Sequence, residues 1–342
     1  MKAAILRNKA MVVDEIDDLE PGPGQVLVET IACGICGSDL HTVDHGHDLV
    51  QASLDAGRDT LLFDPARDLV MGHEMSVRII GLGAGVDSVN EGDAMAAMPM
   101  LLGTDGVHVP GYDNDYPGGY CERMLLSPEA LLPIPNGLDP AVAALTEPMA
   151  VGLHAVNESA IAPGRQAVVV GAGPVGLAII AALISAGRRP VIVSDFSPTR
   201  RALAEQLGAD VIVDPAKQSV FEALKPTDAT DAPVIFEAVG VPGMIDELMR
   251  TAPDRSQILV AGVCLPPDSF HPIYGIYKHL SLQFVLGWTP EEFAASLHNL
   301  AEGKIDGTAF VTGEVDLDGV PQAFRDLANP DDHVKILVRP NG

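Results

Sequence analysis

The chain has 342 residues, of which 47% are hydrophobic, and this is enough for two domains with apolar cores. Its 21 Lys and Arg residues are outnumbered by 47 Asp and Glu residues, and the formal charge of −26 argues against a nucleic-acid partner because it would repel phosphates. No apolar run reaches the roughly 18 residues of a membrane span, and Met1–Ala10 lacks the apolar core of a signal peptide, so we expect a cytoplasmic protein without a membrane partner.

The first 150 residues predict short strands and turns. Ala3–Leu6 indicates a first strand, and Gln25–Thr30 alternates apolar and polar side chains. The region is rich in Gly, Pro and Asp, which is typical of a compact barrel with tight turns. A helical pattern within His47–Arg58 is expected to form part of the mouth of a substrate pocket.

The same region carries residues that bind metals. Cys33 to His41 is followed by Gly72-His73-Glu74 and later by Thr146-Glu147-Pro148, and thiolate, imidazole and carboxylate are all zinc ligands. Four cysteines in a chain of this length do not make a disulfide scaffold. Cys33 and Cys36 form a CxxC, which leaves a redox pair or half a zinc ribbon open. Because the chain has no second CxxC, we interpret Cys33 as a buried strand residue.

From Val151 onward, apolar strands alternate with helices, and this order predicts a parallel sheet with helices on both faces. After Leu286 the alternation fades into two further helices and a last strand. The predicted strands are 167–170, 191–194, 211–213, 234–236, 258–260 and 334–338, and the predicted helices lie within 171–186, 197–207, 291–301 and 320–327.

A glycine-rich loop follows the first of these strands. Gly171, Gly173 and Gly176 form a GxGxxG between an apolar strand and an apolar helix that opens with Pro174 and Val175. These glycines permit a tight turn, the close approach of a pyrophosphate and close packing of the helix on the strand. The helix N-terminus supplies unpaired N–H groups to phosphates, so the loop predicts a dinucleotide site.

Asp195 ends the next strand, 19 residues after Gly176. A carboxylate there accepts hydrogen bonds from ribose hydroxyls and repels a 2′-phosphate, which favours NAD over NADP. Arg200 weakens that preference because a guanidinium attracts a 2′-phosphate. Gly262 and Val263, which follow the strand at 258–260, are added to the predicted cofactor residues.

Taken together, these motifs resemble the zinc-dependent medium-chain dehydrogenase/reductase family of alcohol, polyol and threonine dehydrogenases. The likeness runs nearly end to end. It includes a Cys-Gly-x-Asp-x-His box at 36–41, Gly-His-Glu at 72–74, a Gly-Asp turn at 92–93 and Gly-Gly-Tyr-Cys-Glu at 118–122. It continues with Glu-Pro at 147–148, the GxGxxG at 171–176 and a late basic residue at 335. It implies a GroES-like β-barrel catalytic domain at 1–150 and 287–342, and a Rossmann domain with a doubly wound parallel sheet at 151–286. It also implies a homodimer or homotetramer.

The resemblance further implies roles for single residues. Cys36, His73 and Glu147 match the three catalytic zinc ligands, and Glu74 matches a carboxylate beside the metal. Ser38 and His41 match a proton relay to solvent, and Lys335 matches a basic residue near the cofactor pyrophosphate. Glu147 also begins a predicted helix, where a carboxylate favours the helix dipole without binding metal.

One departure from the family concerns a second, structural zinc, which many members hold with four cysteines in a lobe. Residues 92–115 correspond to that lobe and contain no cysteine, so we expect one catalytic zinc per chain and no structural zinc. Because one thiolate and one carboxylate already balance Zn²⁺, we also expect Glu74 to stay outside the ligand shell of the reactive complex.

The expected activity is reversible hydride transfer between a primary or secondary alcohol, or a polyol, and NAD. Three alternatives remain at this stage: a zinc-free NAD(P)H-dependent quinone or enone reductase, a non-catalytic binding protein of the same fold, and a methyltransferase. The pocket is expected to involve 42–71, 95–120 and 264–290, and these segments do not identify the substrate. Trp288, the lone tryptophan, is placed near the domain cleft with a packing role.

Overall fold

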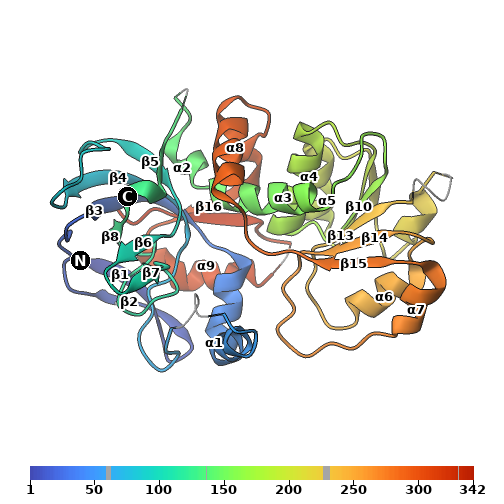
Figure 1. Ribbon diagram of the computed structural model, residues 1–342, viewed down its shortest axis with the longest axis horizontal. Helices are drawn as coiled ribbons and strands as arrows, with labels where there is room; N and C mark the ends of the chain where they lie inside the picture. The colour runs from blue at the N-terminus through green and yellow to red at the C-terminus, as the bar shows by residue number, and fades with distance from the viewer. Residues whose placement is uncertain (59–62, 136, 226–231, 330) are drawn as a thin grey trace.

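The first sheet is built from both ends of the chain. The structure is a computed structural model that describes residues 1–58, 63–135, 137–225, 232–329 and 331–342. Within these residues the sheet order is β16 (Val311–Val315), β17 (Lys335–Val338), β3 (Val26–Gly34), β4 (Glu74–Leu82), β5 (Ala94–Ala97) and β9 (Leu131–Pro133), and β8 (Arg123–Leu126) also pairs with β3. Figure 1 shows the red C-terminal strand β16 running up to the blue and teal N-terminal strands.

The register of this sheet decides which residues meet at its end. β3 and β4 are antiparallel, and Gly34 pairs with Glu74. β17 runs antiparallel to β3 on its other side, with Leu337 opposite Gly34. The end of β3, the start of β4 and the start of β17 therefore lie side by side where these strands end. We call this place the β3–β4 edge.

The second sheet is parallel throughout its described length. Its order is β12 (Val211–Val213), β11 (Val191–Ser194), β10 (Ala167–Val170), β13 (Val234–Glu237), β14 (Gln257–Val260) and β15 (Ser281–Phe284). Numbered from β10 along the chain, this is the 3-2-1-4-5-6 order of a doubly wound dinucleotide-binding sheet. Alternate residues of β10 enter two cores, since Val169 packs with Leu177 on one face and Val168 packs with Leu248 on the other.

Helices cover both faces of the parallel sheet and connect it to the first one (Figure 1). The covering helices are α4 (Pro174–Ser185), α5 (Pro198–Gln206), α6 (Met244–Thr251) and α7 (Pro272–Lys278). Between the two sheets lie α2 (Pro140–Ala143), α3 (Thr146–Glu158) and α8 (Pro290–Ala301). Gly152 lets α3 approach α4 closely, because a Cβ there would overlap the backbone of Ala178.

The remaining elements belong to the N-terminal half and to the last helix. They are the hairpin of β1 (Lys2–Arg7) and β2 (Ala10–Glu15), the helix α1 (Gly37–Asp55), the hairpin of β6 (Leu101–Gly103) and β7 (Gly106–His108), and α9 (Val320–Leu327). In the described part of the chain, 3₁₀ turns lie at 128–130, 220–223, 307–310 and 317–319. In the described residues, no helix is long and apolar enough to cross a membrane.

The main correction to the sequence prediction concerns α1. A helix was expected within His47–Arg58, and the chain is helical there as far as Asp55, but α1 begins earlier, at Gly37. It starts early because Asp39 Oδ2 accepts a hydrogen bond of 2.9 Å from the backbone N–H of Cys36, which satisfies a donor at the helix start. The first turn of α1 therefore holds Ser38 and lies directly after the cysteine predicted to bind metal. The domain boundaries given above stay predictions.

Candidate metal centre and cofactor site

Three of the predicted site residues meet at the shared edge of β3 and β4. Cys36 follows β3 by two residues, and His73 immediately precedes β4, so the pairing of Gly34 with Glu74 brings them together. A sulfur of Cys36, a ring nitrogen of His73 and a carboxylate oxygen of Glu74 all lie within 4.8 Å of one another. His73 and Glu74 are buried, while Cys36 is half-buried. Sulfur, nitrogen and oxygen donors at this spacing fit a zinc ion.

Lys335 compensates the charge of Glu74. Its Nζ lies 2.7 Å from both carboxylate oxygens of Glu74 and donates a further hydrogen bond of 2.9 Å to the backbone oxygen of Ile35. Gly34 makes room for this pair, because a Cβ there would overlap Glu74 Oε2. Burial alone lowers the pKa of Lys335, but the attraction of Glu74 outweighs burial and raises it, so the ammonium stays charged. The assignment of Lys335 to the cofactor pyrophosphate stays a prediction.

Asp39 lies beside the imidazole of His73. Its Oδ1 lies 3.4 Å from His73 Nδ1, and its Oδ2 accepts hydrogen bonds from the Tyr120 hydroxyl at 2.6 Å and from the Cys36 N–H at 2.9 Å. Burial opposes ionisation of Asp39, but His73 and these donors outweigh it and lower the pKa of the carboxyl group. A carboxylate next to the ring of a histidine ligand is a common feature of zinc sites.

Glu147, the third predicted ligand, approaches the cluster from α3. It lies in the first turn of that helix and is buried. Burial raises the pKa of Glu147, while the nearby imidazole of His73 opposes that rise. Its Oε1 accepts a hydrogen bond of 2.7 Å from the indole N–H of Trp288. The structure therefore brings Glu147 near His73, although Glu147 comes from α3 and His73 from the start of β4.

The glycine loop adopts the conformation that its sequence predicts. β10 ends at Val170, Gly171 has φ of 93°, Gly173 caps α4, and Pro174 occupies its first turn. A Cβ at Gly176 would overlap the backbone oxygen of Gly171, so only glycine permits this closeness of helix and turn. The N-terminus of α4 therefore points its free N–H groups at the carboxyl end of the sheet.

Asp195 and Arg200 lie beside that loop. The Asp195 carboxylate accepts hydrogen bonds from the backbone N–H groups of Ala172 at 2.6 Å and Ser197 at 2.7 Å. A Cβ at Gly173 would lie 3.6 Å from an Arg200 guanidinium nitrogen. Within the described part of the chain, the buried Nε of Arg200 has no hydrogen-bond partner. A cation thus lies at the same glycine loop as the carboxylate that was expected to select NAD.

Gly262 and Val263 follow β14 at the same end of the sheet. A Cβ at Gly262 would overlap the backbone nitrogen of Gly240, which comes from the loop after β13. Glu237 orders that loop by accepting hydrogen bonds from the N–H groups of Val239 at 2.7 Å and Gly240 at 2.9 Å. The loops after β10, β13 and β14 therefore meet at the carboxyl ends of the strands, where such sheets bind dinucleotides.

Comparison with known proteins agrees with this arrangement. Residues 22–136 match the alcohol dehydrogenase GroES-like domain, and residues 174–302 match the zinc-binding dehydrogenase domain. The (R,R)-butanediol dehydrogenase of Bacillus subtilis is 31% identical over 354 aligned positions, which cover 100% of both chains. The chain belongs to the zinc-type medium-chain dehydrogenase family.

Further similar proteins include a sorbitol dehydrogenase and a butanediol dehydrogenase of known structure. The sorbitol dehydrogenase of Bacillus subtilis is 26% identical and covers 100% of this chain and 98% of its own. The crystal structure of 2R,3R-butanediol dehydrogenase from Bacillus subtilis superposes with a TM-score of 0.82 at 28% identity and covers 99% of each chain. The dehydrogenase is therefore an oxidoreductase of alcohols or polyols that uses zinc and a nicotinamide cofactor. This excludes the methyltransferase and favours zinc chemistry over the zinc-free reductase and the binding protein.

Tyr112 is a site residue of the dehydrogenase that the sequence did not single out. Its hydroxyl donates a hydrogen bond of 2.8 Å to Ser38 Oγ, and its ring centroid lies 5.3 Å from that of His73. Burial raises the pKa of Tyr112, so the phenol stays protonated. His41 lies on the exposed side of α1, and burial lowers its pKa together with the nearby His45. Only the general expectation that 95–120 lines the pocket pointed towards Tyr112.

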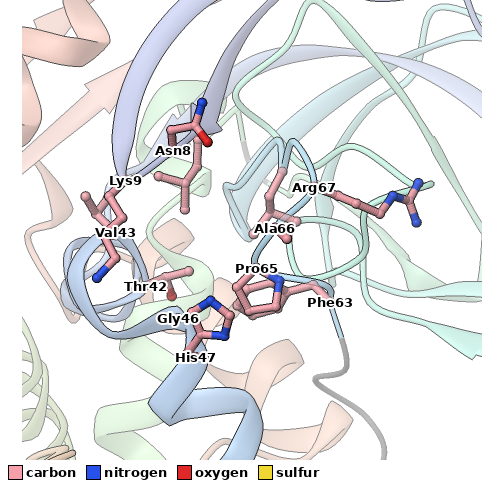
Figure 2. A pocket seen from close by; sticks show the side chains of 12 residues that line it. Asn8, Lys9, Thr42, Val43, Gly46, His47, Phe63, Pro65, Ala66 and Arg67 are labelled. Carbon is pink, nitrogen blue, oxygen red and sulfur yellow. The ribbon is translucent and has the colours of Figure 1, made fainter.

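A cavity of about 300 Å³ is lined by residues close in sequence to Cys36 and His73, but neither of these two residues lines it. Figure 2 shows it between the β1–β2 turn, one side of α1 and the segment after residue 62. Its labelled lining residues are Asn8, Lys9, Thr42, Val43, Gly46, His47, Phe63, Pro65, Ala66 and Arg67. None of the metal-binding candidates belongs to this lining. Residues 59–62 of the expected 42–71 pocket wall lie outside the described residues.

Proposed function

We propose that the dehydrogenase oxidises a secondary alcohol of a diol or polyol with NAD, using one zinc ion held by Cys36, His73 and Glu147. The proposal rests on Cys36 and His73, whose sulfur and ring nitrogen lie within 4.8 Å of each other and of a Glu74 oxygen at the β3–β4 edge. Glu147 lies outside that group, and the proposal adds it as a ligand from the first turn of α3. The names of the relatives, butanediol and sorbitol dehydrogenase, support the substrate class. When bound, zinc would supply a Lewis acid for the alcohol oxygen, and NAD would supply the hydride acceptor.

The charges around the two glutamates support Glu147 as the third ligand. The Glu74 carboxylate is within hydrogen-bond distance of the Lys335 ammonium through both of its oxygens, so its charge is already balanced. Glu147 receives a hydrogen bond from a neutral indole, which leaves its negative charge available to the metal. Cys36 and Glu147 together would then balance Zn²⁺. A ternary-complex crystal structure with a short Glu74–zinc bond would contradict this division of roles.

Ser38, His41 and Tyr112 would handle the proton of the alcohol. Ser38 Oγ accepts the Tyr112 hydrogen bond with one lone pair, so its own hydrogen and its other lone pair remain for the substrate and the next group of the relay. Ser38 and His41 lie about one turn apart on α1, and His41 reaches the exposed side of the helix. This arrangement supports a path from the buried centre to solvent through Ser38 and His41.

The preference for NAD rests on Asp195. Two backbone N–H groups hold its carboxylate beside the glycine loop, where a 2′-phosphate would meet a negative charge. Arg200, at the same loop, would bind the ribose or a neighbouring phosphate. Measuring kcat/KM with NAD and with NADP tests the preference, and equal values for the two cofactors would contradict it.

The lobe that carries the structural zinc in many relatives is held here by hydrogen bonds. His108 Nδ1 lies 2.8 Å from Asp113 Oδ2, and His108 Nε2 lies 3.0 Å from Asp105 Oδ1. The ring of Tyr116 packs on His108 with centroids 4.4 Å apart. A charged imidazolium between two carboxylates thus ties the β6–β7 hairpin to the following loop, and we expect no second zinc.

The free edge of the parallel sheet supports a homodimer. Among the residues that the structure describes, β15 pairs with β14 on one side only, and Phe284 on it is 64% exposed. Leu286 just beyond is 82% exposed, and Ile276 and Tyr277 of α7 are also exposed. An unpaired strand edge beside exposed apolar side chains fits a second copy of the chain.

A cytoplasmic location is part of this proposal and rests on the sequence.

Elemental analysis of zinc per chain tests the metal site first. The wild-type protein is purified without added metal and compared with Cys36→Ser, which removes the only sulfur of the cluster. About one zinc that is lost in the variant, together with NAD-dependent oxidation of 2,3-butanediol or sorbitol, is the expected result. Two zinc ions per chain would contradict the single site. No zinc in a wild-type protein that still binds NAD would restore the zinc-free reductase.

A further inference from the structure

Trp288 lies where the cofactor domain returns to the catalytic domain. It is the lone tryptophan of the chain and occupies the segment between β15 and α8. Gly287, immediately before it, has φ of 74°, which turns the chain sharply at this point. Its ring packs on Phe293 with centroids 5.0 Å apart. Its indole N–H donates a hydrogen bond of 2.7 Å to Glu147 Oε1, across 141 residues of sequence.

A second set of hydrogen bonds fixes the two helices that carry this contact. Glu292 caps the start of α8 by accepting from the Thr289 N–H at 2.8 Å. The same carboxylate accepts from His154 Nδ1 at 2.9 Å and from Asn157 Nδ2 at 2.8 Å, and both of these residues belong to α3. Since Trp288 directly precedes α8 and Glu147 begins α3, Glu292 fixes the distance between the indole and the carboxylate.

We propose that Trp288 is a positioning residue of the metal centre, which holds Glu147 in the orientation that binds zinc. This rests on the proposed function, in which Glu147 is the third ligand. An indole N–H only donates, so it cannot compete with the carboxylate for the metal. It satisfies Oε1 and leaves Oε2 to point elsewhere. Carboxylates that bind metals are themselves hydrogen-bonded by neighbouring groups, and these partners set ligand orientation.

The contrast with Glu74 shows why the donor matters. Lys335 gives Glu74 a full positive charge at 2.7 Å, which competes with a metal ion for that carboxylate. Trp288 fixes Glu147 without neutralising it, so the negative charge remains for zinc. At this centre the Glu74 carboxylate is therefore held by the Lys335 cation, whereas the Glu147 carboxylate is held by the neutral N–H group of Trp288.

The first test compares the zinc affinity of the wild type with that of Trp288→Phe. Phenylalanine retains an aromatic ring against Phe293 and removes the N–H donor. Apo protein is titrated with zinc in competition with a chelator of known affinity. We expect the variant to bind zinc about 10- to 100-fold more weakly, the usual loss when a hydrogen-bond partner of a ligand is removed.

A closer replacement separates the hydrogen bond from packing. Because the chain has one tryptophan, expression in a tryptophan auxotroph replaces residue 288 alone. A benzothienyl analogue keeps the bicyclic shape and lacks the N–H, whereas 5-fluorotryptophan keeps both and serves as the matched control. We expect weaker zinc binding with the first analogue and wild-type binding with the second. Equal affinity in all three proteins would overturn the proposal.

Two further readouts show whether Trp288 acts through Glu147. In the wild type, zinc added to the apo protein should change the emission of the lone tryptophan, because its hydrogen-bond acceptor becomes a ligand. In a Glu147→Ala background, Trp288→Phe should leave the remaining zinc affinity unchanged. An equal loss in both backgrounds would overturn the proposal.

The outcomes distinguish this inference from the proposed function. A wild type with about one zinc and a Trp288→Phe variant of equal affinity would overturn the role of Trp288 and leave the zinc dehydrogenase intact. A wild type without zinc affinity would overturn both. A Trp288→Phe loss of zinc affinity that is equally large with and without Glu147 would assign Trp288 to packing alone.

Discussion

At the scale of single residues, the buried Lys335–Glu74 ion pair has the largest predicted effect on stability. Lys335 is 2% exposed and Glu74 is fully buried, so neither charge can be solvated by water alone. Lys335→Met keeps the volume but leaves the carboxylate buried without its cation. We expect the free energy of unfolding to fall by about 3–5 kcal/mol, the usual cost of breaking a buried pair. Urea denaturation of the purified protein measures this loss.

The double variant Lys335→Met/Glu74→Gln is the control for that experiment. It removes both charges, so it should recover most of the lost free energy of unfolding. Lys304→Met, at an exposed position, should change stability little. A double variant as unstable as the single one would show that Lys335 stabilises the fold by packing and not by its charge.

Tyr112→Phe tests the hydroxyl that holds Ser38. The variant keeps the ring beside His73 and removes the 2.8 Å hydrogen bond to Ser38 Oγ. A hydrogen bond of this kind contributes about 1 kcal/mol, so we expect kcat to fall roughly fivefold to tenfold. Zinc content and the dissociation constant of NAD should stay at wild-type values. An unchanged kcat across the pH profile would remove Tyr112 from the proton relay.

At the scale of elements, the β6–β7 lobe should respond to pH through His108. Burial lowers the pKa of His108, but hydrogen bonds to Asp105 and Asp113 outweigh burial and raise it above its usual 6.5. The histidine thus stabilises the lobe fully below about 6.5, and this contribution is lost as pH rises through the raised pKa. The pKa of Asp105 is lowered from 3.8 by the same contact, so the stabilisation also fails in strong acid.

His108→Phe removes both contacts and keeps a ring against Tyr116. We expect its thermal unfolding midpoint to lie below that of the wild type between about pH 4 and 6.5, and the two midpoints to converge at higher pH. His298→Phe, which changes an exposed histidine on α8, is the matched control. Added salt should narrow the difference, because the carboxylates are partly exposed. A gap independent of pH would assign the lobe's stability to packing.

The elements themselves differ in how well the sequence predicts them. The strands β10 and β11 have the predicted bounds, because buried parallel strands are short apolar runs ended by turn residues. The start of α1 was wrong, since Cys36 is an unusual residue before a helix and the Asp39 contact that stabilises it is not visible as a pattern. Periodicity thus predicted the cofactor domain better than the polar segments around the metal.

At the scale of the whole molecule, the partners of the site residues could not be predicted. The contacts of Lys335 with Glu74, Trp288 with Glu147 and Tyr112 with Ser38 join residues separated by 261, 141 and 74 positions. Their closeness depends on the pairing of β17 with β3 and the packing of α8 on α3, which local patterns do not encode. The metal residues themselves were predicted from chemical type and family resemblance, and the strand register then explains why Cys36, His73 and Glu74 meet.

The assembly of two chains is tested at the free edge of β15. Phe284 is 64% exposed there, and burying it against a second copy would release water from apolar surface. Phe284→Lys places a charge on that edge, which is how natural sheets prevent edge pairing. We expect sedimentation velocity to show a dimeric wild type and a monomeric variant with the same far-UV circular dichroism. Leu54→Lys, at a similarly exposed apolar position on α1, should remain dimeric. A Phe284→Lys variant that stays dimeric would place the interface on another surface, and a monomeric wild type would contradict the dimer itself.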